Sequence, residues 1–170
     1  MIAAMLIDFP MHYLVSLALF GAASLTDMFD GKIARKRGLV TNFGKFSDPL
    51  ADKILVLSAL LCFVQNGLCD CVLVIVVLLR EFAVMSVRLM AASEGKVVAA
   101  NIWGKVKTVS QIVAIIAVFL MQIILGFYST ETLSAAFFIA GEALMWISTV
   151  FCIISGVIYL IDNKQFISME

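Results

Sequence analysis

The chain has 170 residues, of which 63% are hydrophobic and 14% are charged. Its mean hydropathy of +1.09 excludes an ordinary water-soluble domain. Twelve Lys and Arg residues balance twelve Asp and Glu residues, so the charge does not indicate a nucleic-acid-binding protein. At about 20 residues for each membrane-spanning helix, the length allows one compact bundle and almost no domain outside the membrane.

Five long apolar runs follow one another along the chain, separated by polar or glycine-containing segments. They predict membrane-spanning helices at about 12–28, 50–64, 72–90, 106–127 and 136–161. The residues before them are apolar but too few to cross a membrane, and we interpret residues 1–10 as the remnant of a further first helix. The sequence therefore predicts an all-α polytopic membrane protein in which residues 1–170 form a single transmembrane domain.

Basic residues are concentrated in alternate connections between these spans. Such residues in the first connection, in the third, and after the last span are Lys32, Arg35, Lys36, Arg37, Lys45, Lys96, Lys105, Lys107 and Lys164. The connections at 65–71 and 128–134 contain no Lys or Arg. Because cytoplasmic loops of membrane proteins carry the excess of Lys and Arg, we expect the basic connections and the C-terminus to face the cytoplasm.

Four aspartates flank the first basic connection. Asp27 and Asp30 end one predicted helix, and Asp48 and Asp52 begin the next. The i,i+3 and i,i+4 spacings put each pair on one helix face, and the short connection makes the two helices antiparallel neighbours. Carboxylates without nearby His or Cys are the preferred ligands of hard divalent ions. The sequence therefore predicts a site for two Mg²⁺ or Mn²⁺ ions, and with it a phosphate-containing substrate.

An alternative for any single aspartate is that it caps a helix or is solvated at the membrane surface. The four together, at these spacings, favour metal binding. Gly31 and Gly44 leave room for a bulky ligand to approach the helix backbone. Arg35 lies one turn beyond Gly31, where its guanidinium could neutralise a diphosphate. The alternative for Arg35 is a simple positive-inside residue.

These residues form the pattern D-x-x-D-G-x-x-A-R-x₈-G-x-x-x-D-x-x-x-D, which resembles the signature of the CDP-alcohol phosphatidyltransferases. The fixed positions are filled by Asp27, Asp30, Gly31, Ala34, Arg35, Gly44, Asp48 and Asp52. The resemblance implies a bundle of six transmembrane helices, the first of them truncated here. It also implies transfer of a phosphate-linked alcohol from a CDP-alcohol to a second alcohol, with release of CMP.

The resemblance also implies a role for each residue of the motif. The implied metal ligands are Asp27, Asp30, Asp48 and Asp52. The implied CDP-binding residues are Asp27, Asp30, Gly31, Ala34, Arg35 and Gly44. Asp52 would act as a metal ligand or as the catalytic general base at the acceptor hydroxyl. This reading agrees with the residue chemistry, because a carboxylate near the bilayer has a raised proton affinity.

Charged residues also occur inside the third full span and at the start of the fourth. Charges inside a span are energetically expensive and usually functional. We predict that Arg80, Arg88, Lys105 and Lys107 form a basic pocket beside the aspartates, which binds the phosphate of the acceptor. In the alternative, Arg80 pairs with Glu81 or an aspartate, while Arg88 and both lysines extend to the membrane surface.

Within the family, the stretch Arg80-Glu81-Phe82, then Arg88, and the segment 103–108 resemble the bacterial phosphatidylglycerophosphate synthases. This resemblance implies CDP-diacylglycerol as donor and sn-glycerol 3-phosphate as acceptor, giving phosphatidylglycerophosphate and CMP. It further implies a homodimer in the bacterial inner membrane, with the active site facing the cytoplasm. Inositol phosphate, phosphatidylglycerol and serine are alternative acceptors within the same family.

A divalent-cation carrier is an alternative from a different class, since it too would use membrane carboxylates. Such a pathway needs polar groups through the middle of the bilayer, and the segments 54–64 and 112–121 offer only Ser58 and Cys62. A purely structural membrane protein is a third alternative. It leaves the spacing of the four aspartates unexplained.

Overall fold

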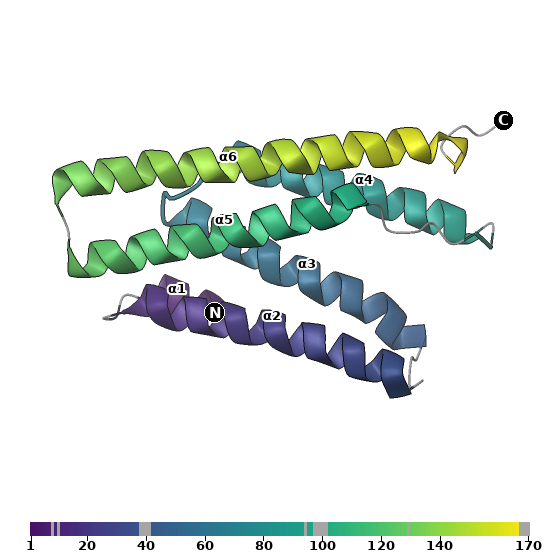
Figure 1. Ribbon diagram of the computed structural model, residues 1–170, viewed down its shortest axis with the longest axis horizontal. Helices are drawn as coiled ribbons and strands as arrows, with labels where there is room; N and C mark the ends of the chain where they lie inside the picture. The colour runs from purple at the N-terminus through teal and green to yellow at the C-terminus, as the bar shows by residue number, and fades with distance from the viewer. Residues whose placement is uncertain are drawn as a thin grey trace.

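A computed structural model describes residues 1–7, 9, 11–37, 42–93, 95–96, 102–128 and 130–166. For residues 27–37 and 42–52 this description covers the helical backbone alone. The elements are α1 (Ile2–Leu6), α2 (His12–Arg37), α3 (Asn42–Gln65), α4 (Cys71–Ser93), α5 (Ile102–Phe127), α6 (Glu131–Asp162) and the 3₁₀ helix η1 (Lys164–Phe166). The described ranges contain no strand, so the predicted all-α class is confirmed (Figure 1).

Each predicted span lies within one helix, but the helices are longer than the apolar runs. The second helix of the chain continues to Arg37 and α3 already begins at Asn42. Charged residues end an apolar run without ending a helix, because the backbone hydrogen bonds of a helix are made within the helix itself. By length and composition, α5 and α6 are the two described helices that are able to cross a membrane. Six spans therefore remain a prediction.

Glycines end α3 and α4 in the same way. Gly67 has a φ of +68° and Gly95 has a φ of +73°, a left-handed conformation that glycine adopts without steric cost. After α3, the backbone N–H of Leu68 donates to the carbonyl oxygen of Phe63, and the backbone N–H of Gly67 donates to the carbonyl oxygen of Val64. These paired hydrogen bonds form the Schellman motif, which satisfies the last carbonyls of the helix and turns the chain back.

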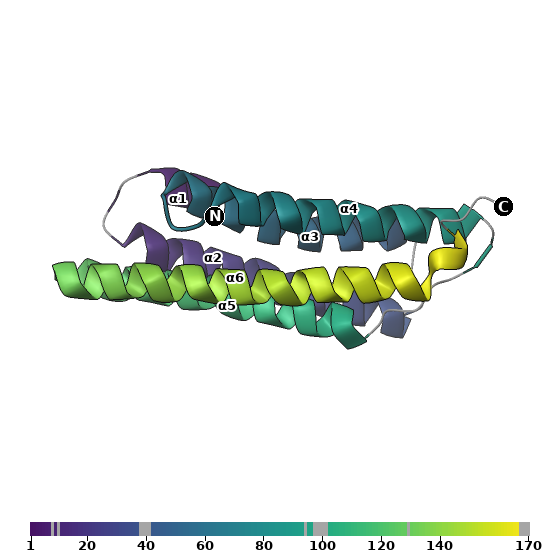
Figure 2. The ribbon, with the colours of Figure 1, turned by 90° about the horizontal axis from the view of Figure 1, so that it is seen from above.

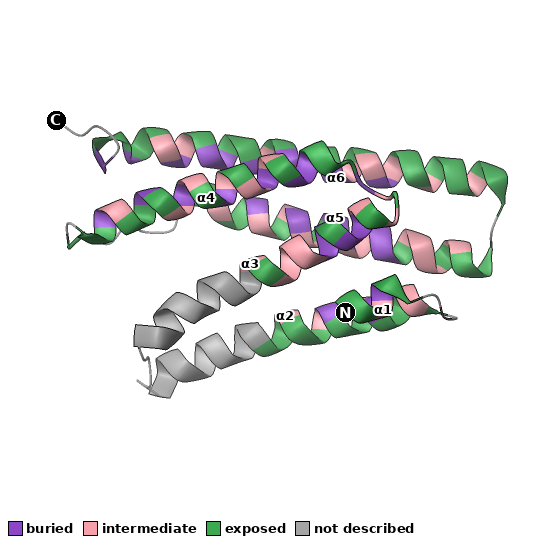
Figure 3. Ribbon diagram, turned by 180° about the vertical axis from the view of Figure 1, so that it is seen from behind, coloured by how far each residue is buried: buried purple, intermediate pink, exposed green. Residues whose placement is uncertain are grey.

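The helices form two layers. Seen from above, α1, α3 and α4 lie on one side, and α2, α5 and α6 lie on the other (Figure 2). The last two long helices, α5 and α6, are antiparallel and pack along each other, while α4 packs against α6. The second helix, α2, contacts both α3 and α5. The sides of α4, α5 and α6 that face one another carry the buried residues (Figure 3).

Three phenylalanines join helices from both layers in the main core. Phe119 of α5 lies with its ring centroid 4.9 Å from that of Phe63 on α3 and 6.2 Å from that of Phe20 on α2. All three are buried, with at most 1% of their surface exposed. Burying aromatic side chains of this size contributes a large share of the packing energy. This core fixes α3 against α5 and so positions the charged residues about three to four turns away on these two helices.

The chain reversals bring the charged segments to one end of the bundle. The C-terminal ends of α4 and α6 lie beside the N-terminal end of α5 (Figure 1). The connection 66–70, the C-terminal end of α5 and the N-terminal end of α6 lie at the other end. The described basic residues at these helix ends thus lie on the opposite side of the core from the ends joined by the connections that lack Lys and Arg.

Candidate active site

A cavity of about 520 Å³ opens between α3, α4, α5 and α6 at the charged end of the bundle. Its polar lining comes from all four helices. The charged and polar lining residues are Lys53, Arg80, Glu81, Arg88, Lys105, Lys107, Thr108, Gln111, Ser155 and Tyr159. The structure therefore brings all four residues of the predicted basic pocket to a single cavity.

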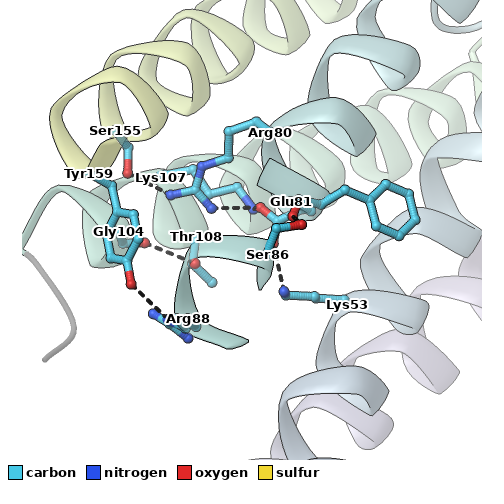
Figure 4. Close-up of polar contacts among 11 residues, drawn as sticks. Lys53, Arg80, Glu81, Ser86, Arg88, Gly104, Lys107, Thr108, Ser155 and Tyr159 are labelled. Atoms are coloured by element: carbon cyan, nitrogen blue, oxygen red, sulfur yellow. Dashed lines mark hydrogen bonds and ion pairs between the residues drawn. The ribbon is translucent and has the colours of Figure 1, made fainter. Parts of the chain in front are cut away.

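Glu81 is the centre of the charged contacts in this cavity (Figure 4). Its Oε1 atom lies 2.6 Å from Nζ of Lys107 and 2.8 Å from Nη1 of Arg80. Its Oε2 atom lies 3.4 Å from Nζ of Lys53. Glu81 and Lys107 are buried, with 8% and 7% of their surface exposed. One buried carboxylate thus contacts three cations from three helices, and these cations compensate its charge, as a buried charge requires.

Arg80 is fixed between α4 and α6. Its Nη2 atom donates to the hydroxyl of Ser155 at 2.8 Å, while Nη1 is bound to Glu81. Its aliphatic stem lies directly against Gly156, where an added Cβ would come within 2.7 Å of Cγ of Arg80. The absence of a side chain at Gly156 therefore makes room for Arg80.

The two other predicted basic residues lie at the exposed part of the cavity lining. Arg88 contacts Tyr159 of α6, with Nε 3.4 Å from the phenolic oxygen and Cζ 5.7 Å from the ring centroid. Lys105 is exposed, one turn before Val109 on α5. Among the described residues, neither Arg88 nor Lys105 forms an ion pair with a carboxylate.

The aspartate motif falls on the facing ends of two helices. Its first part lies in α2 and its second part in α3. The structure describes only the helical backbone at the motif residues, so contacts of their side chains lie outside the described part of the chain; these residues are Asp27, Asp30, Gly31, Ala34, Arg35, Gly44, Asp48 and Asp52. The described part of the chain contains no group of three His, Cys, Asp or Glu residues arranged to hold a metal. The metal ligands and CDP-binding residues accordingly remain predictions.

The structure contains one contact that the alternative interpretation of the basic residues predicted, namely the ion pair of Arg80 with Glu81. It differs from that alternative at Lys107, which is buried against Glu81 and does not extend to the surface. The reason is that α5 packs with Lys107 toward α4, so the nearest anion is inside the bundle.

Sequence reasoning missed Lys53 and the contributions of α6. The signal for Lys53 was its position directly after Asp52, at the start of an apolar run. The signal in α6 was the group Ser155, Gly156 and Tyr159 in an otherwise apolar helix, since small and hydroxyl residues in such helices mark close helix contacts. The contact of Lys53 with Glu81 depends on how α3 and α4 pack, which the sequence pattern does not specify.

Residues 1–155 match the sequence profile of the CDP-alcohol phosphatidyltransferase family. The chain belongs to this family. It is 44% identical over 156 residues to the CDP-diacylglycerol–glycerol-3-phosphate 3-phosphatidyltransferase of Bacillus subtilis, covering 92% of this chain and 77% of that protein. A protein of the same name from Rickettsia bellii is 34% identical over 160 residues, covering 94% of this chain and 84% of that protein.

Family membership confirms the resemblance to the CDP-alcohol phosphatidyltransferases, and the names of the relatives agree with the resemblance to the bacterial phosphatidylglycerophosphate synthases. As a CDP-alcohol phosphatidyltransferase, the chain is an enzyme of the transferase class. Together with the apolar helices α5 and α6, the membership also identifies a membrane protein of lipid biosynthesis. Enzymes of this family generally depend on divalent metal ions.

Proposed function

We propose that this enzyme transfers the phosphatidyl group of CDP-diacylglycerol to sn-glycerol 3-phosphate, giving phosphatidylglycerophosphate and CMP. The names of the relatives from Bacillus subtilis and Rickettsia bellii support this choice of donor and acceptor. The observation that carries the proposal is the cationic cavity, whose described lining on α3 includes Lys53, the residue after Asp52 of the family motif. A site suited to an anionic acceptor therefore adjoins, along α3, the motif proposed to bind the donor.

The residues of the motif fit the divalent ions on which the family depends. Asp27, Asp30, Asp48 and Asp52 would hold them, because a set of carboxylates from two contacting helices offers the oxygen ligands that Mg²⁺ and Mn²⁺ prefer. When bound, two such ions would neutralise the diphosphate and stabilise the charge that develops on it. The CDP-binding residues are again Asp27, Asp30, Gly31, Ala34, Arg35 and Gly44.

The acceptor is activated at its hydroxyl. The hydroxyl oxygen forms a bond to the phosphorus that carries the diacylglycerol, the bond from this phosphorus to the CMP oxygen breaks, and CMP leaves. The hydroxyl proton passes to the carboxylate of Asp52. Helical register supports this role, because Asp52 and Val56 are four residues apart and therefore share a face, and Val56 lines the cavity.

The cavity carries more positive than negative charge. Among its described lining residues, five cations face the single carboxylate of Glu81; the cations are Lys53, Arg80, Arg88, Lys105 and Lys107. Cations held in a partly buried site require an anion to compensate for their lost hydration. A phosphate group on the acceptor supplies that anion, and a volume of about 520 Å³ accommodates glycerol 3-phosphate. A neutral acceptor such as serine or free inositol would leave these cations uncompensated.

The proposal extends to the surroundings of the enzyme. The positive-inside rule places the charged end of the bundle, and with it the active site, on the cytoplasmic face of the bacterial inner membrane. Six membrane spans and a homodimer are part of the same proposal. The outward faces of α5 and α6 expose large apolar residues suited to lipid or to a second copy.

The experiment is a transfer assay with purified enzyme, CDP-diacylglycerol, Mg²⁺ or Mn²⁺ and radiolabelled glycerol 3-phosphate. We expect label to enter a lipid product and CMP to be released in equal amounts, both only when donor and acceptor are present together. Asp48→Asn serves as the inactive control. Release of CMP without an acceptor, or no transfer of label to lipid, would contradict the proposed reaction.

A further inference from the structure

The five cations of the cavity are not equivalent, because Glu81 contacts only three of them. Lys107, Arg80 and Lys53 lie 2.6, 2.8 and 3.4 Å from its carboxylate oxygens. Arg80 also donates a hydrogen bond to the hydroxyl of Ser155. We call Lys53, Arg80, Lys107 and Glu81 the inner layer of the cavity. Its charge is partly neutralised and its side chains are fixed by one another.

Arg88 and Lys105 form what we call the outer pair. Arg88 follows Glu81 by seven residues on α4, which is about 10 Å along a helix. Lys105 precedes Lys107 by two residues on α5 and is exposed, whereas Lys107 is buried. Tyr159 orients Arg88 without neutralising it, since a hydroxyl and a ring carry no net charge. Within the described part of the chain, the outer pair therefore keeps its full positive charge.

A phosphate group would experience different electrostatic fields at the inner layer and at the outer pair. At Lys107 it would lie beside the Glu81 carboxylate, because Oε1 of Glu81 is only 2.6 Å from Nζ of Lys107. A phosphate bound to the same ammonium group would be a close neighbour of that carboxylate, and like charges that are close together repel strongly in a partly buried site. At the outer pair the phosphate would meet two cations and no described carboxylate. The outer pair is therefore the more favourable binding position for a phosphate group.

We propose that Glu81 is a positioning residue for the acceptor, which keeps the acceptor phosphate out of the inner layer and directs it to Arg88 and Lys105. This inference rests on the proposed function and refines it, since it separates Arg88 and Lys105 from Arg80 and Lys107. The depth at which the phosphate binds in the cavity in turn determines where the acceptor hydroxyl lies. An acceptor bound too deeply would place its hydroxyl away from the reacting phosphorus, and turnover would fall although binding is retained.

The sharpest test compares two lysines that are two residues apart on α5. Lys105→Met should raise the glycerol 3-phosphate KM roughly ten- to hundredfold, because it removes a charge-assisted contact to phosphate. Lys107→Met should raise this KM less than about threefold, since Lys107 contributes to the electrostatic field of the cavity without contacting the phosphate. The inhibition constant of inorganic phosphate should follow the same order. Equal effects of the two substitutions, or a larger effect of Lys107→Met, would overturn the proposal.

Glu81 itself is tested by Glu81→Gln, which keeps the shape of the side chain and removes its charge. We expect kcat to fall about tenfold or more and inorganic phosphate to inhibit about tenfold more strongly, while the acceptor KM does not rise. A purely structural role would instead weaken phosphate inhibition together with activity. Glu81→Asp keeps the charge and should restore phosphate inhibition to within about threefold of the wild type.

Two further variants complete the design. Glu131→Gln, an exposed position at the opposite end of α6, is the matched control and should leave all constants unchanged. The double variant Glu81→Gln/Lys107→Met restores the charge balance of the cavity, so phosphate inhibition should return to near the wild-type level even if Glu81→Gln alone does not fold. Failure to return would contradict the proposal. Absence of wild-type transfer to glycerol 3-phosphate would instead refute the proposed function, so the two failures are distinguishable.

Discussion

The guanidinium of Arg88 lies over the ring of Tyr159, with Cζ 5.7 Å from the ring centroid and Nε 3.4 Å from the phenolic oxygen. This contact links α4 to α6 at the exposed part of the cavity lining. It orients Arg88 and leaves the other guanidinium nitrogens able to donate to an anion. Arg88 is thus a pre-oriented cation in the candidate acceptor site.

Arg88→Ala should raise the KM for glycerol 3-phosphate roughly ten- to hundredfold, because a charge-assisted hydrogen bond to phosphate is worth about 1.5–3 kcal/mol. The KM for CDP-diacylglycerol should stay nearly constant. Tyr159→Phe keeps the ring and removes the hydroxyl, so its effect on the acceptor KM should be below about fivefold. Initial rates against both substrates measure these values.

The control for this pair is Lys164→Ala, which removes an exposed cation that does not line the cavity. Its kinetic constants should match the wild type. If Arg88→Ala raised the donor KM as much as the acceptor KM, Arg88 would act on both substrates and its place in an acceptor site would be wrong.

Gly156→Ala should destabilise the protein by about 1–3 kcal/mol, because the new Cβ would meet the stem of Arg80 at 2.7 Å. Arg80 has little freedom to move, since it is bound to both Glu81 and Ser155. Unfolding of the detergent-solubilised protein by heat or denaturant measures the change. The matched variant is Gly126→Ala on α5, where a Cβ meets nothing within 4 Å. Equal stability of the two variants would show that Arg80 is not tightly held.

The sequence predicted the helical class and the position of each long helix, since apolar runs of this length have few other interpretations. The helix ends were predicted less well. Asn42 begins α3 eight residues before the apolar run does, and Arg37 ends α2 well beyond it. Hydropathy reports where a segment can be buried in lipid, whereas helix length depends on backbone hydrogen bonds and capping.

The candidate site was predictable only where its residues were unusual for their surroundings. Arg80 and Arg88 were identified because cations inside an apolar span are costly. Ser155 and Tyr159 were not, because such residues are common in apolar helices and nothing in the sequence shows that they face α4. The central position of Glu81 is likewise a result of packing, as its partners come from α3, α4 and α5.

Asp48→Asn and Asp52→Asn should fail in different ways. Asp48→Asn should abolish turnover and weaken Mn²⁺ binding in parallel, because it removes a proposed metal ligand. Asp52→Asn should cut the rate by roughly 10² or more while the enzyme still binds CDP-diacylglycerol, because it removes the proposed base. Binding of Mn²⁺ and of the donor lipid is measured separately from turnover. If Asp52→Asn lost donor binding as strongly as turnover, Asp52 would be mainly a metal ligand. Full activity of Asp48→Asn would contradict the metal site.

The orientation in the membrane is tested by Cys71, the exposed cysteine at the end of the bundle opposite the cavity. A membrane-impermeant maleimide added to intact cells should label it, and Cys71→Ser should remove the label. Cys69 is buried, and burial followed by the Asp70 carboxylate raises the pKa of its thiol to about 11. It should therefore react slowly at pH 8 and faster as the pH rises toward 11. Labelling of Cys71 only in inside-out vesicles would reverse the proposed orientation.

An acceptor panel with purified enzyme and CDP-diacylglycerol tests the central claim most directly. Glycerol 3-phosphate, inositol phosphate, phosphatidylglycerol, serine and free inositol are offered in parallel, and kcat/KM is measured for each. We expect glycerol 3-phosphate to be used best and the neutral acceptors poorly, because the cations of the cavity would be left without an anion. Preference for serine, with a KM that Arg88→Ala leaves unchanged, would contradict the claim that the cavity binds the acceptor phosphate.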